Sequence, residues 1–262
     1  MGKHHRRNAV AYGTLVLGGA LAVAGAAGAG VAAAASSTGA TGATGATSAV
    51  SASTTARGAK FLAAQKALEA SLALRTTQLS KLGTDVSDNS KVLTSSDLTT
   101  LTDRLQAETA SISGLATQVQ SDTTWAELTS ARHTMLYDNR VFAVMTPQVF
   151  EVIEADTVAG EVSTLEAEEP GLQSAVNSIA GQPGAQNAAN HYAAFVKLVN
   201  TAANVSLGVS ARVLAVIPQQ WPNAQHVFVT ANRQLLQADL ALARAQYDAT
   251  VIGLATGGYT GS

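Results

Sequence analysis

The chain has 262 residues, of which 47% are hydrophobic and only 13% charged, and it contains no cysteine. A formal net charge of −2 excludes a strong overall field that would attract nucleic acid or anionic lipid. The absence of cysteine excludes disulfides, thiol catalysis and cysteine-ligated metals, and is compatible with an exported protein that does not need disulfides.

Residues 1–36 have the pattern of an export signal. Lys3, Arg6 and Arg7 form a positive start, an uncharged run follows from Ala9 to Ala35, and this run ends in small residues. We therefore expect a signal peptide that is cleaved on export. The run is also long enough to span a bilayer, so an uncleaved N-terminal anchor is the alternative.

Residues 37–57 are rich in Thr, Gly, Ala and Ser and include a Thr-Gly-Ala repeat. Such a segment buries almost no apolar surface, so we expect a disordered linker. Residues 58–255 then form the folded domain, and residues 256–262 are a flexible tail.

From Ala59 onward, apolar residues recur at steps of three and four, which predicts an all-α domain. The first two helices are expected to form an antiparallel hairpin, with its turn between Val86 and Leu98. Facing residues then have numbers that add up to 183 or 184. The inward positions are Gln65, Leu68, Leu72, Arg75, Leu79, Leu82 and Val86, and Leu98, Leu101, Leu105, Glu108, Ile112, Leu115 and Val119.

This register predicts a charged pair inside the first hairpin. Arg75 and Glu108 are the charged residues of the two inward faces, and the register places them opposite each other. We expect a structural ion pair that fixes the register more than it adds stability. The alternative is that both side chains extend outward to solvent.

A second antiparallel hairpin is expected downstream, with its turn between Ile179 and Tyr192 and with facing numbers that add up to 371. Pro170 interrupts its first arm, so a kink is expected there. The inward positions are Val158, Val162, Leu165, Glu169, Leu172, Val176 and Ile179, and Tyr192, Phe195, Val199, Ala202, Ser206, Val209 and Val213.

Two further helices complete the predicted fold, which is an elongated bundle of long antiparallel helices with the seams of a coiled coil. A short helix from about residue 122 to 137 connects the two hairpins. After a break at Pro218, a last helix runs from Asn223 to about Leu254. Its candidate packing residues are Phe228, Leu235, Leu236, Leu240, Leu242 and Tyr247.

No catalytic, cofactor or metal motif is evident. His133, His191 and His226 have no Glu or His at ligand spacing on their own helices, and no phosphate loop or nucleophile elbow occurs. We therefore predict a protein that is not an enzyme and has no cofactor. An enzyme acting on the envelope is the least favoured alternative, because it would need a cleft with converging acids.

Acidic residues accumulate on the first arm of the second hairpin, in a segment without Lys or Arg. One hypothesis is an interaction face for divalent cations or a basic partner. The other is a solvated face that keeps the helices soluble, which is the more common role of such charge runs. The residues are Glu151, Glu154, Glu161, Glu166, Glu168 and Glu169.

The segment between the two hairpins, residues 137–156, combines aromatic residues with one arginine. Thr146-Pro147 is a typical helix start. We expect Arg140 to form an ion pair with Asp156, or with the nearby Glu154 or Asp138, and so to fix the corner where the chain turns. A ligand-binding arginine is the alternative.

The stretches "LTSSDLTTLTDRLQAETASISGLATQVQSDTTWAEL", "YDNRVFAVMTPQVFEVIEAD" and "VLAVIPQQWPNAQHVF" resemble a group of uncharacterised secreted proteins of Gram-positive, mainly actinobacterial, bacteria. The shared positions include Arg140, Val141, Phe142, Pro147 and Asp156, and the resemblance covers roughly residues 60–252. It implies a secreted helical bundle and no known activity.

These features together predict an exported, non-enzymatic structural or interaction protein of the cell envelope or extracellular space. Its partner would be a protein or a cell-wall component. Contact with a membrane would occur only through the N-terminal segment, if that segment is not cleaved.

Overall fold

A computed structural model describes the backbone of residues 45–257 and the side chains of residues 58–257. The chain divides into two compact units, residues 1–53 with residue 262, and residues 54–261. Of the first unit, only the helical residues 45–53 are described, so the following account concerns the second unit. The predicted signal segment 1–36, residues 37–44 of the predicted linker, and residues 258–262 of the predicted tail lie outside the described residues.

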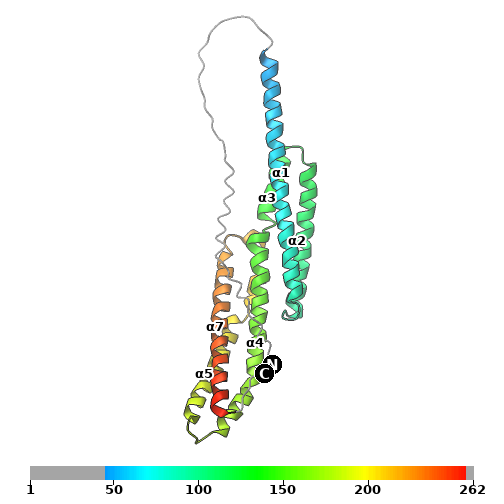
Figure 1. Ribbon diagram of the computed structural model, residues 1–262. Helices are drawn as coiled ribbons and strands as arrows, with labels where there is room; N and C mark the ends of the chain where they lie inside the picture. The colour runs from blue at the N-terminus through cyan, green and yellow to red at the C-terminus, as the bar shows by residue number, and fades with distance from the viewer. Residues whose placement is uncertain (1–44, 258–262) are drawn as a thin grey trace, which may run out of the picture. The chain divides into compact units, whose positions relative to one another are not determined.

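The described residues form helices and contain no strand, so the predicted all-α bundle is confirmed (Figure 1). The helices are α1 (Gly45–Asp88), α2 (Ser95–Ser121), α3 (Trp125–Tyr137), a π-helical turn (Val141–Met145), α4 (Thr146–Ser178), α5 (Ala185–Ser206), α6 (Val209–Leu214), a 3-10 turn (Pro218–Gln220) and α7 (Gln225–Thr256). No helix in the described part of the chain is long and apolar enough to cross a membrane.

Helix α1 begins earlier than expected. Residues 45–57, which the composition assigns to a disordered linker, are helical. Alanine has the highest helix propensity, and a helix that is already formed extends at little cost, so this stretch can continue the helix that packs from residue 59 onward. The linker prediction is therefore corrected for residues 45–57.

The register of the first hairpin agrees with the predicted one. Gln65 Nε2 donates a hydrogen bond of 2.6 Å to the carbonyl oxygen of Val119, and the numbers of these two residues add up to the predicted 184. Thr94 caps α2 by accepting a hydrogen bond from the backbone N–H of Asp97. All the predicted leucine, isoleucine and valine positions of this seam are buried except Leu98, which is half-buried.

The second hairpin has a different register from the predicted one. The hydroxyl of Tyr192 donates to Glu169 Oε1, whereas the predicted register places Tyr192 opposite Ile179. The amide of Gln148 donates to the carbonyl oxygen of Val213, whose predicted partner is Val158. The numbers of both pairs add up to 361, so each contact is shifted by ten residues from the predicted 371, which is one heptad and a further step of three.

The length of the turn explains this shift. An apolar pattern that repeats every seven residues fixes a register only up to steps of seven. Helix α4 continues through Pro170 to Ser178 and α5 starts at Ala185, so residues 179–184 make a shorter connection than expected. The predicted second arm is also divided, because α5 ends at Ser206 and α6 starts after Gly208, which has a left-handed φ of 69°.

Helix α7 packs against both α4 and α5 and forms the centre of a three-helix arrangement. Its buried residues include Phe228, Leu235 and Leu242, as predicted. The other three predicted packing residues, Leu236, Leu240 and Tyr247, are exposed. The hydrophobic pattern of α7 is therefore only partly explained by the core of this chain.

Candidate functional site

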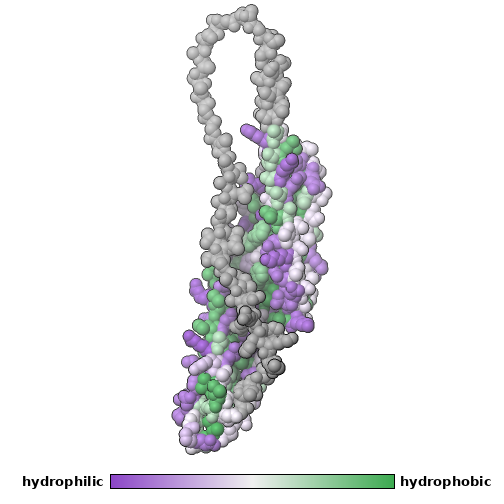
Figure 2. All heavy atoms as spheres, in the orientation of Figure 1, coloured by the Kyte–Doolittle hydropathy of each residue, from purple (hydrophilic) through white to green (hydrophobic). Residues whose placement is uncertain are grey.

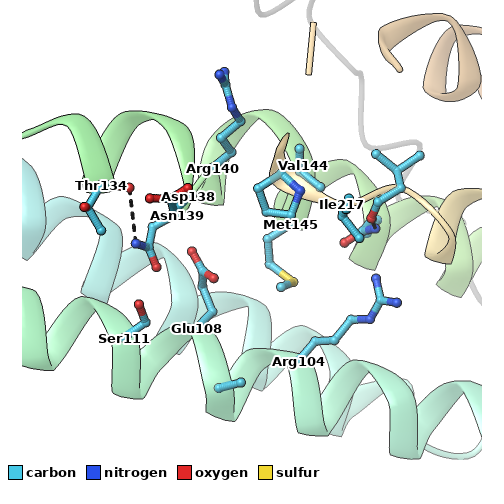
Figure 3. Close-up of a pocket in the computed structure, with 14 residues that line it drawn as sticks. Arg104, Glu108, Ser111, Thr134, Asp138, Asn139, Arg140, Val144, Met145 and Ile217 are labelled. Carbon is cyan, nitrogen blue, oxygen red and sulfur yellow. Dashed lines mark hydrogen bonds between the residues drawn. The ribbon is translucent and has the colours of Figure 1, made fainter. Parts of the chain in front are cut away.

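A pocket of about 450 Å³ lies where α2, the end of α3, the start of α4 and the segment before the 3-10 turn meet (Figure 3). Helix α2 contributes Arg104 and Glu108, whose side chains extend toward the pocket. The capping box of Thr124 and Glu127 fixes the start of α3, and the last turn of this helix contributes Thr134 to the pocket. The pocket combines charged groups with apolar walls, as ligand sites do.

Two buried amides form part of the pocket wall. Gln148 is only 1% exposed, and its Nε2 donates to the carbonyl oxygens of Val213 and Val216 at 3.0 and 2.7 Å. Val213 lies in the last turn of α6 and Val216 just after the helix, where carbonyl oxygens lack a complete set of helical donors. Asn139 is 2% exposed, and its Nδ2 donates to the carbonyl oxygen of Thr134. The amides thus fix both backbone segments on which the pocket depends.

Glu108 is the titratable residue of the pocket with the clearest perturbation. Burial raises the pKa of its carboxyl group to about 7, and the positive charge of Arg75 opposes this increase. Its Oε1 is buried and accepts no hydrogen bond from the described residues. A carboxyl group in this state can donate or accept a proton near neutral pH, and can form a hydrogen bond to a small polar molecule in the pocket.

Arg75 and Glu108 interact electrostatically, and each charge affects the pKa of the other group. No direct ion pair or hydrogen bond joins the two side chains in the described part of the chain. The guanidinium of Arg75 instead donates to the carbonyl oxygen of Ser71 and lies 5.4 Å from the centre of the Phe142 ring. The predicted direct ion pair is therefore not formed, although the two charges interact, and Phe142 is a neighbour of Arg75 that the pattern did not predict.

We expect a double-mutant cycle with Arg75→Met and Glu108→Gln to give a coupling of about 0.5–1 kcal/mol at pH 8. The coupling should become smaller toward pH 5.5, because Glu108 then takes up its proton. Denaturant unfolding of the four proteins at both pH values measures this. A coupling that is equal at both pH values would contradict the electrostatic origin.

Arg140 and Asp156 have different partners, so the predicted ion pair between them is corrected. Arg140 points away from the pocket in Figure 3, and its guanidinium lies 5.1 Å from the centre of the Tyr137 ring. Asp156 Oδ2 accepts from the backbone N–H of Thr94 at 2.7 Å, at the start of α2. Burial raises the pKa of Asp156, and the Thr94 hydrogen bond opposes this increase.

The reason for this correction is the π-helical turn at Val141–Met145, which continues directly into α4. The pattern predicted a turn before Thr146 that would fold Arg140 back along the helix. Because the chain is helical from Val141, Arg140 and Asp156 lie roughly 24 Å apart along the axis at about 1.5 Å per residue. That distance is beyond the reach of an arginine side chain.

The predicted acidic face of α4 consists of residues in different environments. Glu166 is exposed, whereas the other five are half-buried. Glu169 accepts the hydrogen bond from Tyr192, and burial raises the pKa of Glu151 to about 8. No group of three His, Asp or Glu residues that could hold a metal ion occurs among the described residues. The hypothesis of a cation-binding or basic-partner-binding face stays a prediction, and these environments do not favour it.

One polar contact of the bundle has no signal in the sequence pattern. His191 Nδ1 lies 2.7 Å from Asp248 Oδ1, so the pair connects α5 and α7. The two residues are far apart in the chain, and neither occurs in a recognisable motif. Only the packing of α5 on α7 brings them together.

Helix α7 carries a row of exposed hydrophobic residues along its outer face. Val229, Leu236, Leu240, Tyr247 and Leu254 are 52%, 61%, 54%, 65% and 79% exposed, and we call them the α7 stripe. Figure 2 shows hydrophobic residues at the surface over α7, next to hydrophilic ones. Single exposed apolar residues are common, but a continuous apolar patch marks an interaction site.

Comparison with protein-family models, with curated proteins and with solved structures gives no match for this chain. The resemblance to secreted actinobacterial proteins thus stays a prediction.

Proposed function

We propose that this protein is an exported, non-enzymatic interaction protein of the cell envelope or extracellular space, and that α7 is its contact surface. The α7 stripe is the observation that supports this proposal most strongly. Its five large hydrophobic side chains face solvent on a helix whose other face is already packed. A soluble protein rarely keeps such a row exposed unless another surface covers it.

The pattern of residues 1–36 supports the exported location. We expect a C-terminally tagged chain to be found in the envelope fraction or the culture medium of the producing cells. Recovery of the tagged chain only in the cytosol would contradict the location.

The contact surface is tested separately, by photo-crosslinking in intact cells. A photoreactive phenylalanine analogue in place of Leu240 is expected to give a covalent protein adduct. The same analogue in place of Leu74, which is 65% exposed on α1, is the control and should give none. Equal labelling at both positions, or no adduct at position 240, would contradict the role of α7.

A further inference from the structure

We propose that the partner of the α7 stripe is a second copy of the same chain, packed antiparallel along α7 about a two-fold axis. This inference rests on the proposed role of α7 as a contact surface and specifies what covers it.

The outer face of α7 has the spacing of a coiled-coil seam. The α7 stripe residues follow a strict alternation of four and three residues, with Arg233, Ala243 and Thr250 at the intervening positions, and all of these positions are exposed. The buried face of α7 follows a similar repeat, which includes Phe228, Leu235 and Leu242. Helix α7 thus has one seam inside the bundle and another with the same spacing outside it.

The outer seam is complementary to itself when two copies run antiparallel. Val229 then faces Leu254 of the second copy, Leu236 faces Tyr247, and Leu240 faces Ala243. Each pair occurs twice, as a two-fold axis requires. Large residues face small or medium ones near the centre of the seam, where Ala243 allows the two helices to approach closely.

The charges on α7 favour this orientation over the parallel one. A parallel pairing would place Arg233 directly against Arg233 of the second copy, and like charges in a seam are unfavourable. In the antiparallel pairing, Arg233 faces Thr250. Asp239 and Arg244, which flank the seam, then lie beside the neutral amides of Gln246 and Gln237.

The size of the surface is also suitable for a dimer. From their exposed fractions, the five stripe residues present on the order of 600 Å² per copy, or roughly 1,200 Å² for two copies, which is the lower end of specific interfaces. A membrane surface is less suitable, because interfacial helices are rich in Lys and Arg on the polar face. Helix α7 has two arginines, two aspartates and no lysine.

Sedimentation equilibrium of the purified protein over a range of concentrations tests the proposal. We expect a reversible monomer–dimer equilibrium for the wild type. Leu240→Glu should weaken it by at least roughly 100-fold, because the new carboxylate would be buried in the seam of both copies. Leu74→Glu is the matched control and should leave the equilibrium unchanged. Circular dichroism melts of both variants show whether they are folded.

A wild-type protein that stays monomeric at the highest concentration would overturn the proposal, and so would a dimer that Leu240→Glu and Leu74→Glu affect equally. The mass of the photo-adduct at position 240 separates this inference from the proposed function. An adduct of twice the mass of the chain supports self-association. An adduct of another mass, together with a monomeric protein, leaves the contact surface intact and refutes the second copy as its partner.

Discussion

Replacing Glu151 with glutamine is expected to stabilise the protein at pH 8, and the gain should become smaller as the pH falls toward 5. Burial raises the pKa of this carboxyl group from 4.5 to about 8, and its Oε2 is buried and accepts no hydrogen bond from the described residues. At pH 8 the folded protein must therefore hold a partly ionised group in an unfavourable place. Glutamine is neutral at every pH and resembles the protonated form.

The direction follows from proton linkage. Between pH 4.5 and 8 the folded protein binds more protons at Glu151 than the unfolded chain does, so the free energy of unfolding falls as the pH rises through this range. The full shift corresponds to at most about 5 kcal/mol at about 1.36 kcal/mol per pKa unit. Solvent near the half-buried carboxyl group reduces the expected gain at pH 8 to roughly 1–3 kcal/mol. Glu108, with its pKa near 7, adds to the same trend.

Denaturant unfolding of the wild type and Glu151→Gln at pH 5 and pH 8 measures this effect. Glu166→Gln is the control, because Glu166 is exposed on the same helix. It should have little effect at either pH. A Glu151→Gln protein that gains no stability between pH 5 and pH 8 relative to the wild type would show that this carboxyl group is not desolvated.

Gln148→Leu is expected to destabilise the protein by roughly 1–3 kcal/mol, because the carbonyl oxygen of Val216 loses the amide donor and that of Val213 keeps only the backbone N–H of Val216. Leucine has a similar size, so the loss would come from the hydrogen bonds to Val213 and Val216 and not from a cavity. The backbone of residues 209–216 should open first, because the amide of Gln148 binds carbonyl oxygens in the last turn of α6 and just after it.

Thermal or denaturant unfolding gives the stability change, and hydrogen exchange of the amides of residues 209–216 shows where it occurs. Gln173→Leu is the control, since Gln173 is exposed on the same helix. A loss below about 0.5 kcal/mol, within the range of ordinary surface substitutions, would mean that water replaces the amide.

The first hairpin could be predicted from the sequence in detail. Most of its inward positions are apolar, but Gln65, Arg75 and Glu108 are polar or charged. A heptad pattern allows several registers, and the positions of these polar residues favour one of them. The hydrogen bond from Gln65 to Val119 agrees with that register. The same register shows that Arg75 and Glu108 affect each other electrostatically, but it does not show that they form no direct ion pair.

The predicted seam of the second hairpin also contains polar residues, but the predicted register places Glu169, Tyr192 and Ser206 each opposite an apolar residue. Their positions therefore did not fix the register, which depends on a turn whose length the pattern does not give. Arg140 could not be placed because a π-helical turn has no clear sequence signal. Leu236, Leu240 and Tyr247 of the outer seam are predicted as packing residues, since a hydrophobic repeat does not show whether its partner lies in the same chain or in another. The residues of the α7 stripe are the ones on which the proposed function depends.

Cysteine crosslinking across α7 tests self-association most directly, because the natural chain has no cysteine. In the antiparallel pairing, Leu236→Cys and Tyr247→Cys face each other, whereas the two copies of position 236 lie roughly 16 Å apart along the axis, too far for a disulfide. We predict a disulfide-linked dimer when the two variants are mixed and oxidised, and none from either variant alone. Crosslinking of each variant with itself would indicate a parallel pairing, and no crosslink in the mixture would contradict the dimer.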